Sequence, residues 1–393
     1  MQQSPLQPTP VGAFRFNTDS SKLEYYDGNQ WVNITSTSPQ AQTGGTRALV
    51  GGGYDGSSYY KNIDYFNVES TGNAADFGEL QNLSGWLGAL ADRTRGIFLS
   101  DGNSGGSEDN TSYVTIASTG NAATFGNLTV GNNYASGLAD NTRGVRGGGY
   151  PSTDVIDYCT IQSTGDWKDF GNLTVSRLTH GCGVSSPTRG IWGGGDLYNP
   201  STTATNRIDY ITISTTGNFL DFGNLTASRL THGCGVSSPT RGIWGGGDLY
   251  NPSTNATNTV DYITISTTGN AADFGDLSVT RKAVAGCANA VRGIWSGGYN
   301  PTYLNTMDYL TLATLGNATD FGDSTWTGAY KSGASSPTRG TWSGGRVHPS
   351  PGRQNIIDYT QIMTTGNAID FGDLTAAEFD GAGGCSNGHG GLG

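Results

Sequence analysis

Hydrophobic and polar residues alternate along short stretches of the chain, which is the pattern of β-strands. In residues 207–215, which read RIDYITIST, Ile208 and Tyr210 fall on one face of such a strand, while Ile211 and Ile213 fall on the other. Apolar side chains on both faces indicate a sheet that is covered on both sides. The pattern therefore predicts strands packed between two neighbouring layers.

The same strand pattern recurs along the chain at a spacing of roughly 45 to 52 residues. Residues 178–202 and 230–254 are identical in every position. Three landmarks recur seven times in a fixed order, and a period of this size predicts a propeller or a solenoid of seven units. The landmarks are an Arg before an apolar pair (Arg47, Arg95, Arg143, Arg189, Arg241, Arg292, Arg339), a Tyr within a strand (Tyr65, Tyr113, Tyr158, Tyr210, Tyr262, Tyr309, Tyr359) and a Phe-Gly pair (Phe77, Phe125, Phe170, Phe222, Phe274, Phe321, Phe371).

Each repeating unit contains four short strands. In residues 179–226 the strands THGCGVSS, IWGGG, RIDYITIST and LDFGNLT are separated by turns and loops rich in Pro, Gly and Asn. The array opens at a second strand, residues 46–53, and ends with a first strand, Gly383–Asn387. We therefore expect an all-β fold with a seven-bladed β-propeller of four-stranded blades at residues 46–393. Its C-terminal strand should complete the first blade and remove the exposed sheet edges.

The first strands are rich in Gly, Ala, Ser and Cys, which suits strands that converge on the axis of a ring. Four of the five cysteines, Cys182, Cys234, Cys287 and Cys385, occupy the same place in different units. Equivalent positions in separate blades do not come close enough for a disulfide. We expect these cysteines to be small, buried and unpaired.

The seven landmark arginines share one turn position, in units that also carry Asp before Tyr or before Phe. This arrangement predicts charge-assisted hydrogen bonds within or between blades.

The N-terminal residues 12–34 form a separate pattern of three short alternating stretches joined by turns. They predict a small β-meander within residues 1–36, followed by a linker at residues 37–45. A segment under ~40 residues seldom has a core of its own, so its apolar side chains should attach it to another surface. The candidate attachment residues are Phe14, Phe16, Leu23, Tyr25, Tyr26 and Trp31.

The stretch FNTDSSKLEYYDGNQW, residues 16–31, resembles a short meander near the N-termini of fibre and appendage proteins of tailed bacteriophages. The repeats resemble the glycine-rich repeat proteins encoded by phages of marine cyanobacteria. These resemblances imply a virion protein, assembled in the host cytoplasm and attached to other virion proteins through its N-terminal segment. They make a homotrimer the first expectation, and docking to a single virion partner the second.

The order of landmarks within a unit resembles the kelch repeat of β-propellers, which implies a kelch-like blade. Phe222 stands where a kelch repeat usually has Trp. The residues that carry this resemblance are Arg177, His180, Gly193–Gly195, Tyr158, Tyr210 and Phe222.

Charge and hydropathy argue against two classes of partner. The net charge of −11, with only five lysines, argues against a nucleic-acid surface, because phosphate binding needs clustered Lys and Arg. No apolar run approaches the ~18 residues of a membrane span. We expect neither nucleic acid nor an inserted membrane among the partners.

Motifs that suggest catalysis or metal binding lack the residues needed to complete a site. The Asp-Phe-Gly triplets recur without a kinase lysine strand, catalytic loop or phosphate-binding loop, so we interpret them as turns of the blades. His180 with Cys182, and His232 with Cys234, offer two ligands each, whereas a zinc site needs about four. We expect no catalytic residue, no metal and no cofactor, and hence no enzyme.

The loops after the glycine runs are the part of the unit that differs most between repeats. Tyr and Asn in variable loops on a rigid ring suit a recognition surface, because Tyr gives a large contact area at a small entropic cost. The alternative is that these loops are only solvated connections. The candidate receptor-binding residues are Tyr54, Tyr150, Tyr198, Asn199, Tyr250, Asn251, Tyr299, Asn300 and Tyr303.

Two functions remain open from the sequence. The first is host-surface recognition by a tail fibre or similar appendage, with a host glycan or protein as the ligand. The second is purely structural: a decoration or spacer of the capsid, neck or tail that packs only against other virion proteins. An enzyme is disfavoured because no unit gathers an acid pair or a nucleophile that its sister units lack.

Overall fold

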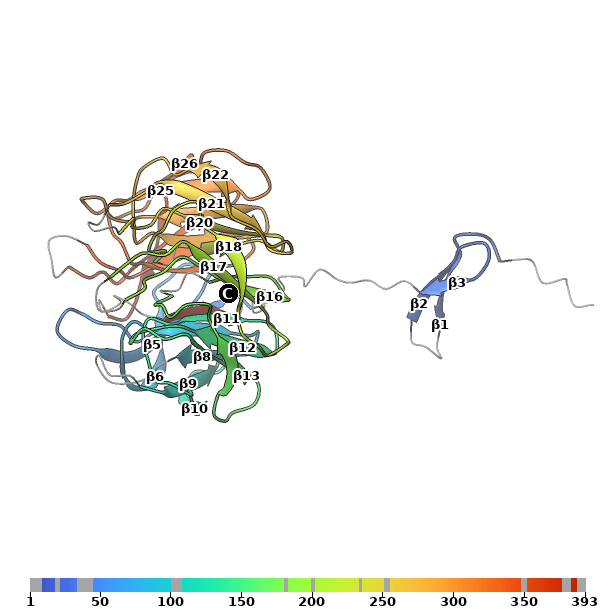
Figure 1. Ribbon diagram of the computed structural model, residues 1–393, viewed down its shortest axis with the longest axis horizontal. Coiled ribbons are helices and arrows are strands. Elements are labelled where there is room, and N and C mark those ends of the chain that lie inside the picture. Colours follow the sequence, from blue (N-terminus) through green and yellow to red (C-terminus); the bar gives the residue numbers. More distant parts are fainter. Residues whose placement is uncertain are drawn as a thin grey trace, which may run out of the picture. The chain divides into compact units, whose positions relative to one another are not determined.

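The structure is a computed structural model, and its described residues contain β-strands but no helix. The chain divides into two compact units, Met1–Ala41 and Gln42–Gly393 (Figure 1). Residues 37–44 of the predicted linker lie outside the described residues. The described residues are 9–17, 22–33, 45–99, 108–179, 183–198, 202–232, 235–250, 255–347, 352–376 and 383–386.

The smaller unit is an antiparallel sheet of three strands: β1 (Phe14–Asn17), β2 (Lys22–Tyr26) and β3 (Trp31–Asn33). The turn between β2 and β3 forms because the carboxylate of Asp27 accepts the backbone N–H groups of Asn29 and Gln30, each at 2.8 Å. The predicted β-meander is therefore confirmed.

The larger unit contains seven antiparallel sheets of four strands each, none of them closed on itself. Together with the meander, the described residues form eight sheets. We number the four-stranded sheets as blades 1 to 7. The strands of each blade follow from the axis outward. Blade 1 contains β31 (Gly383–Ser386), β4 (Arg47–Gly51), β5 (Tyr60–Asn67) and β6 (Ala75–Ser84); blade 2 contains β7 (Gly88–Ala91), β8 (Arg95–Leu99), β9 (Asn110–Thr115) and β10 (Ala123–Asn127); blade 3 contains β11 (Ser136–Ala139), β12 (Arg143–Gly147), β13 (Val155–Thr160) and β14 (Lys168–Asn172); and blade 4 contains β15 (Gly183–Ser185), β16 (Arg189–Gly193), β17 (Arg207–Thr212) and β18 (Leu220–Asn224). Blade 5 contains β19 (Gly235–Ser237), β20 (Arg241–Gly245), β21 (Thr259–Thr264) and β22 (Ala272–Asp276); blade 6 contains β23 (Ala285–Ala288), β24 (Arg292–Ser296), β25 (Thr306–Thr311) and β26 (Thr319–Asp323); and blade 7 contains β27 (Ser332–Ser335), β28 (Arg339–Ser343), β29 (Ile356–Gln361) and β30 (Ile369–Asp373).

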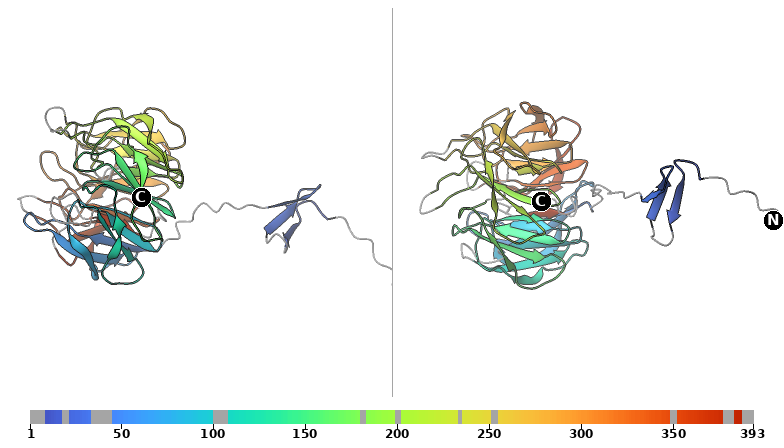
Figure 2. Two further views of the ribbon diagram at one scale, coloured as in Figure 1. Left: turned by 60° about the horizontal axis from the view of Figure 1, so that its bottom comes forward. Right: turned by 45° about the vertical axis from the view of Figure 1, so that its right-hand side comes forward.

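The innermost strands of the blades form a ring. Each of β7, β11, β15, β19, β23 and β27 lies beside the innermost strand of the next blade, and β31 lies beside both β27 and β7. In Figure 2 the colours follow the sequence around this unit from blue to red. The prediction of an all-β propeller of four-stranded blades is confirmed.

The C-terminal strand completes blade 1, as the sequence predicted. In β31, Gly384 pairs with Val50 and Cys385 with Leu49 of β4. The last residue of the predicted closing strand, Asn387, lies outside the described residues. First and last segments of the propeller thus share one sheet, and this pairing covers the inner edge of β4.

The core lies between the blades because both faces of each blade are covered. Ile208 and Asp209 in β17 are fully buried although they point to opposite faces, and Ile211 is only 4% exposed. The Trp residues at the end of the second strands are also fully buried: Trp192, Trp244, Trp295 and Trp342. Large aromatic rings at the blade interfaces supply much of the apolar area removed from water.

The Phe-Gly landmark forms the contact between an outer strand and the turn before the outer strand of the next blade. Gly78 has a φ of 147°, and a Cβ there would lie 2.4 Å from the carbonyl oxygen of Gly120 in the next blade. The N–H of Gly120 donates to the carbonyl of Phe77 at 2.7 Å. The equivalent bond recurs between all neighbouring blades and runs from Gly72 to Phe371 between blades 1 and 7. Only glycine permits this approach.

The landmark arginines also connect neighbouring blades. Nη1 of Arg241 donates to the carbonyl of Leu312 in the next blade at 2.7 Å, and the guanidinium lies 5.0 Å from the ring centroid of Tyr262 in its own blade. The expected hydrogen bonds between blades are present, although their acceptors are main-chain carbonyls and not the Asp carboxylates. The seven donors are Arg47, Arg95, Arg143, Arg189, Arg241, Arg292 and Arg339.

The Asp residues that precede the landmark Tyr have a different set of partners. Asp209 is fully buried, accepts a hydrogen bond from the hydroxyl of Thr174 in the preceding blade at 2.6 Å, and forms an ion pair with Arg177. Similar buried ion pairs link Arg229 to Asp261 and Arg281 to Asp308. These carboxylates therefore fasten one blade to the next.

Candidate functional site

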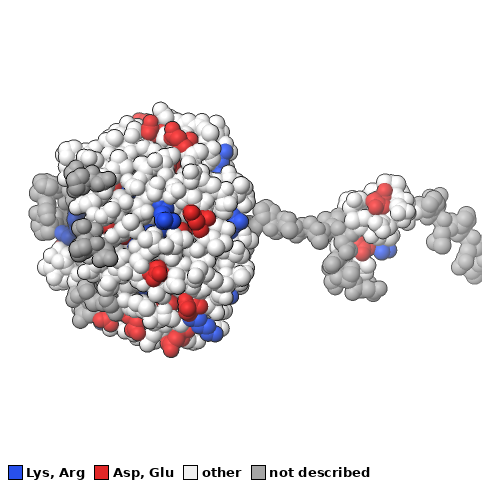
Figure 3. All heavy atoms as spheres, in the orientation of Figure 1, with Lys and Arg blue, Asp and Glu red and all other residues white. Residues whose placement is uncertain are grey.

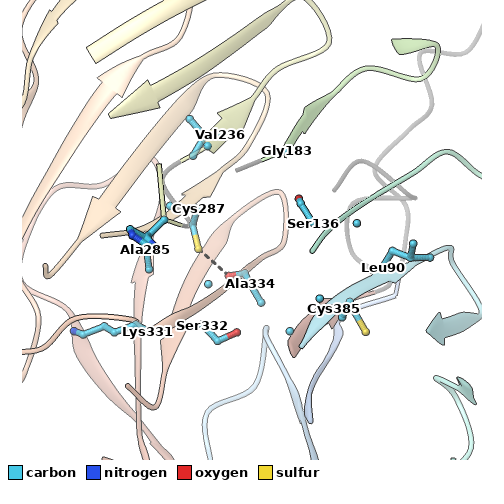
Figure 4. A pocket seen from close by; sticks show the side chains of 18 of the residues that line it. Leu90, Ser136, Gly183, Val236, Ala285, Cys287, Lys331, Ser332, Ala334 and Cys385 are labelled. Carbon is cyan, nitrogen blue, oxygen red and sulfur yellow. Dashed lines mark hydrogen bonds between the residues drawn. The ribbon is translucent and has the colours of Figure 1, made fainter. Parts of the chain in front are cut away.

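A cavity of about 940 Å³ lies where the first strands of the blades converge (Figure 4). Its wall is made of small residues because the strands approach closely there. A Cβ on Gly333 would lie 2.6 Å from the carbonyl oxygen of Gly286 in the neighbouring blade, and one on Gly88 would lie 2.7 Å from that of Ala135. The expectation of small residues on the innermost strands is confirmed at these positions.

The two ends of the cavity differ in composition. At one end, where the first strands turn back into the second strands, the lining residues are small or polar, such as Ala91, Ala139, Ser238 and Asn289. Among the described lining residues, no Trp, Tyr or Phe lies at that end. The other end carries five such side chains, which we call the aromatic mouth: Trp86, Tyr134, Tyr150, Tyr198 and Tyr330.

The aromatic mouth is built from two kinds of segment, contributed by blades 2, 3, 4 and 7. Trp86, Tyr134 and Tyr330 precede the first strands β7, β11 and β27, while Tyr150 and Tyr198 follow second strands. Bridges such as Asn133 to Tyr150 hold these segments side by side. The antiparallel pairing of first and second strands therefore brings both kinds of segment to the same end of the ring.

On one side of the mouth, the rings form a continuous arc. Trp86 stacks on Tyr134 with their centroids 5.4 Å apart and an interplanar angle of 26°. Tyr54 lies 5.3 Å from Trp86, and Tyr59 lies 4.6 Å from Tyr54. Such contacts stabilise a ring pair by about 0.5–1.5 kcal/mol beyond burial, so the arc is held in a fixed arrangement.

Three tyrosines of the mouth, which come from blades 3, 4 and 7, are more accessible. Tyr150 and Tyr198 contact each other at 5.5 Å between centroids and are 37% and 36% exposed. Tyr330 is 40% exposed, lies 6.2 Å from the ring of His232, and has the guanidinium of Arg346 at 5.5 Å from its centroid. The exposed surfaces of Tyr150 and Tyr198 are accessible to a ligand.

Three residues of the mouth have a left-handed backbone, which large side chains rarely adopt. Trp86, Tyr134 and Tyr330 have φ angles of 54°, 55° and 58°, and Ala283 has the same geometry at the equivalent position of another blade. The N–H of Tyr330 donates to the carbonyl of Ala283 at 3.1 Å. A strained non-glycine backbone costs about 1 kcal/mol or more and is often found at functional sites.

The charges near the mouth are few and mostly compensated. Burial lowers the pKa of His232 to about 4, so this imidazole is neutral at neutral pH. Lys282 forms an ion pair with Asp248 at 2.7 Å. Burial raises the pKa of Asp196, which accepts the N–H of Thr203 at 2.9 Å.

Deeper in the cavity, Lys331 turns away from the axis. Its Nζ donates to the hydroxyl of Ser324 at 2.9 Å and lies 3.8 Å from Asp358, and burial lowers the pKa of Lys331 to about 8. Burial raises the pKa of the Cys287 and Cys385 thiols to about 12, so both are protonated and poorly nucleophilic. Within the described part of the chain, no group of three His, Cys, Asp or Glu residues is placed to hold a metal ion.

The predicted receptor-binding residues separate into groups. Tyr150 and Tyr198 line the cavity, and Tyr54 belongs to the adjoining arc. The other described residues do not line the cavity. They are Tyr250; Tyr299 and Tyr303, which pack on each other at 5.1 Å; and Asn300, whose side chain donates to the hydroxyl of Thr280 at 2.7 Å. Asn199 and Asn251, like His180, Cys182 and Cys234, lie outside the described residues.

Sequence reasoning missed Trp86, Tyr134 and Tyr330 as site residues. The signal was present, because each of these residues stands directly before a run of small residues that forms a first strand: WLGALA, YASGLA and YKSGAS. A bulky ring at the entrance to a run of small residues marks the end of the channel.

The candidate attachment residues fall on two faces of the meander. Phe14, Phe16, Leu23 and Tyr25 share one face and are 68%, 62%, 46% and 37% exposed. Tyr26 and Trp31 are paired across β2 and β3 on the opposite face, with ring centroids 5.5 Å apart.

On that opposite face, the side chains of the meander contact one another. The guanidinium of Arg15 lies 4.3 Å from the ring of Trp31 and forms an ion pair with Glu24 at 2.8 Å. The structure therefore leaves one apolar face of the meander open, and uses Tyr26 and Trp31 to build the other.

A comparison with protein-family models matches none of them, and a comparison with curated proteins finds no relative. Among the described residues, no helix is long and apolar enough to cross a membrane.

Proposed function

We propose that this chain is a virion appendage protein of a tailed phage, such as a tail fibre, whose propeller binds the host surface at the aromatic mouth. The observation that carries the proposal is the concentration of five Trp and Tyr side chains at one end of the channel. A closed ring needs small residues near its axis, and the opposite end meets that need without aromatic lining residues. The rings at the mouth therefore exceed what the fold requires, and exposed aromatic clusters are typical of binding sites.

Binding without catalysis suits the chemistry at the mouth. The ionisable side chains there include a neutral His232, an Asp196 that accepts the backbone N–H of Thr203, and Arg346 above a tyrosine ring. This set offers hydrogen bonds and ring faces but no acid pair. We infer that the protein is not an enzyme and needs no cofactor.

The N-terminal sheet supports a role in attachment. Phe14 and Phe16 are more than half exposed on an apolar face of a unit with three short strands. Exposed apolar patches of this kind mark interaction sites. We propose that this face binds two further copies of the chain in a homotrimer, or else another virion protein, and that the protein is part of the virion.

A structural spacer that packs only against other virion proteins is the second candidate. It is favoured by apolar residues exposed on the outer strands of the propeller, where Leu220 is 57% and Ile369 is 58% exposed. In that case, another virion protein covers the sides of the ring.

Binding of the labelled full chain to cyanobacterial host cells distinguishes the two. Host recognition predicts saturable binding that Trp86→Ala weakens at least tenfold, whereas Tyr250→Ala, in a loop that does not line the cavity, leaves it unchanged. Failure of the full chain to bind any host strain, with specific binding to phage particles that lack it, would favour the spacer.

A further inference from the structure

We infer that the ligand of the aromatic mouth is a neutral oligosaccharide that stacks on Trp86 and Tyr198. This inference rests on the proposed binding function and names its ligand class. It is carried by the geometry of the rings, the size of the cavity and the distribution of charge around them.

The shape of the site suits an extended chain of small rings. The cavity of about 940 Å³ is at the upper end of the ~300–1,000 Å³ typical of small-molecule sites, so it holds more than one small ring. Trp86 precedes the first strand of blade 2 and Tyr198 follows the second strand of blade 4, so that a ligand lying across the mouth meets rings from separate blades. A chain of sugar rings presents flat surfaces along its length.

Ring faces and hydroxyl groups match the two kinds of surface on a sugar. A pyranose carries C–H groups on its faces and hydroxyl groups around its edge. The aromatic faces contact the C–H groups, and the tyrosine hydroxyls and backbone groups of the mouth exchange hydrogen bonds with the sugar edge. A purely apolar ligand, by contrast, would leave the polar groups of the wall, such as the hydroxyls of Ser136 and Ser332, without partners.

The charge distribution disfavours ionic ligands of either sign. The chain has a net charge of −11, and on the face shown in Figure 3 the basic side chains of the larger unit are scattered among acidic ones, with no basic patch to hold a polyanion. A cationic ligand would sit over aromatic faces. Two of those faces already carry guanidinium groups, since Arg346 lies over Tyr330 and Arg353 lies 5.8 Å from the centroid of Tyr54. A neutral ligand meets neither obstacle.

The mouth is ordered before any ligand binds. Ring contacts fix Trp86 against Tyr134 and Tyr54, and the left-handed backbone at Trp86 and Tyr134 sets the direction of these side chains. Binding to such a site costs little side-chain entropy, so stacking energy is retained as affinity.

The chain itself supplies a matched control. Tyr198 and Tyr250 occupy the same position in two segments of identical sequence, 178–202 and 230–254. Only Tyr198 lines the cavity, where it contacts Tyr150. A substitution at Tyr250 therefore reproduces the local effect on the loop without touching the proposed site.

The test is a glycan array probed with the full chain, followed by isothermal titration with the best neutral oligosaccharide. The array carries neutral glucose, mannose, galactose and N-acetylglucosamine oligomers beside sulfated, sialylated and uronic-acid oligomers. We expect binding to a neutral oligomer. Trp86→Ala and Tyr198→Ala should each raise its Kd at least tenfold, while Tyr250→Ala changes it less than twofold and Trp86→Phe recovers most of the affinity.

Thermal unfolding of each variant shows whether it is folded, and if Trp86→Ala is not, Tyr198→Ala and Trp86→Phe carry the test. Binding to charged oligomers alone, to no oligomer, or with equal losses at Tyr198 and Tyr250 overturns the inference. Host-cell binding that persists without any glycan binding overturns this inference but leaves the proposed function standing. Glycan binding without host-cell binding overturns the proposed function but leaves this inference standing.

Discussion

Nη1 of Arg177 lies 2.9 Å from Oδ2 of Asp209, and neither side chain has any exposed surface. Arg177 also donates to the main-chain carbonyl of Trp192 at 3.2 Å. A buried ion pair costs much desolvation energy, so its removal is tolerated only when both charges are removed. The pair is therefore a sensitive probe of how the blades are fastened together.

Asp209→Asn should lower the free energy of unfolding by about 3–5 kcal/mol, because it leaves the Arg177 charge buried without its partner. Asp64→Asn is the matched control. Asp64 holds the same position in blade 1 and binds Thr375, but in the described structure it forms no ion pair, and burial raises its pKa. Its loss should stay near about 1 kcal/mol, the value of a hydrogen bond. Urea unfolding measures both, and equal losses would contradict the role of the ion pair.

Arg241→Ala should lower the free energy of unfolding by about 1–2 kcal/mol, because it removes the hydrogen bond to Leu312 across the blade interface and the contact with Tyr262. Arg207→Ala, at an exposed position at the start of β17, serves as the control and should change it by less than about 0.5 kcal/mol. Denaturant midpoints compare the two. An unchanged midpoint for Arg241→Ala would show that this arginine only occupies a solvated turn.

Deletion of residues 383–393 should lower the melting temperature by about 10 °C or more, since a loss of several kcal/mol shifts a domain of this size by that order. The deletion removes β31 and leaves the inner edge of β4 unpaired. Removal of residues 388–393 alone keeps the strand and should have little effect. Scanning calorimetry of both truncations gives the answer, and two equal melting temperatures would rule out closure by β31.

The stability of the protein should fall as the pH is lowered from 6.5 to 4, in part because of His232. The folded-state pKa of this imidazole is lowered to about 4, whereas the unfolded chain titrates at 6.5. Between these values the unfolded state binds the extra proton, so acid favours unfolding. His232→Gln should lose less stability than the wild type between pH 6.5 and 4. Above pH 7, the free energy of unfolding of the two proteins should depend on pH with the same slope. Parallel slopes of the two proteins between pH 4 and 6.5 would contradict the assignment.

The full chain should self-associate through the open face of the meander, and Phe14→Ser with Phe16→Ser should abolish this. Both side chains are more than 60% exposed on that face. As a control, Val11→Ser removes an apolar side chain that lies outside the strands and is 74% exposed. It should not change the molar mass of the oligomer. Light scattering on the full chain measures the oligomer. A monomeric wild type would redirect the search to a single virion partner.

The sequence alone determined the repeat. It predicts seven units of four strands each, and a C-terminal strand that pairs with the second strand of the first unit. These features depend on the alternation of apolar and polar residues within short stretches and on the regular spacing of these stretches, and both recur in all seven units. Glycine landmarks also had to recur, because a backbone that approaches its neighbour as Gly78 does admits no other residue. The mouth was only partly within reach, through the loop tyrosines Tyr150 and Tyr198.

Tertiary structure decided which side chains face one another. Tyr198 and Tyr250 share their sequence surroundings, yet of the two only Tyr198 lines the cavity, where it contacts Tyr150 of the preceding blade. Six of the seven landmark arginines likewise donate to main-chain carbonyls 66 to 76 residues further along the chain, and Arg339 donates to that of Val68 in blade 1; none of these acceptors is an Asp of the same unit. A local pattern fixes the face on which a side chain lies, but its partner comes from another blade. That partner is set only when the ring closes.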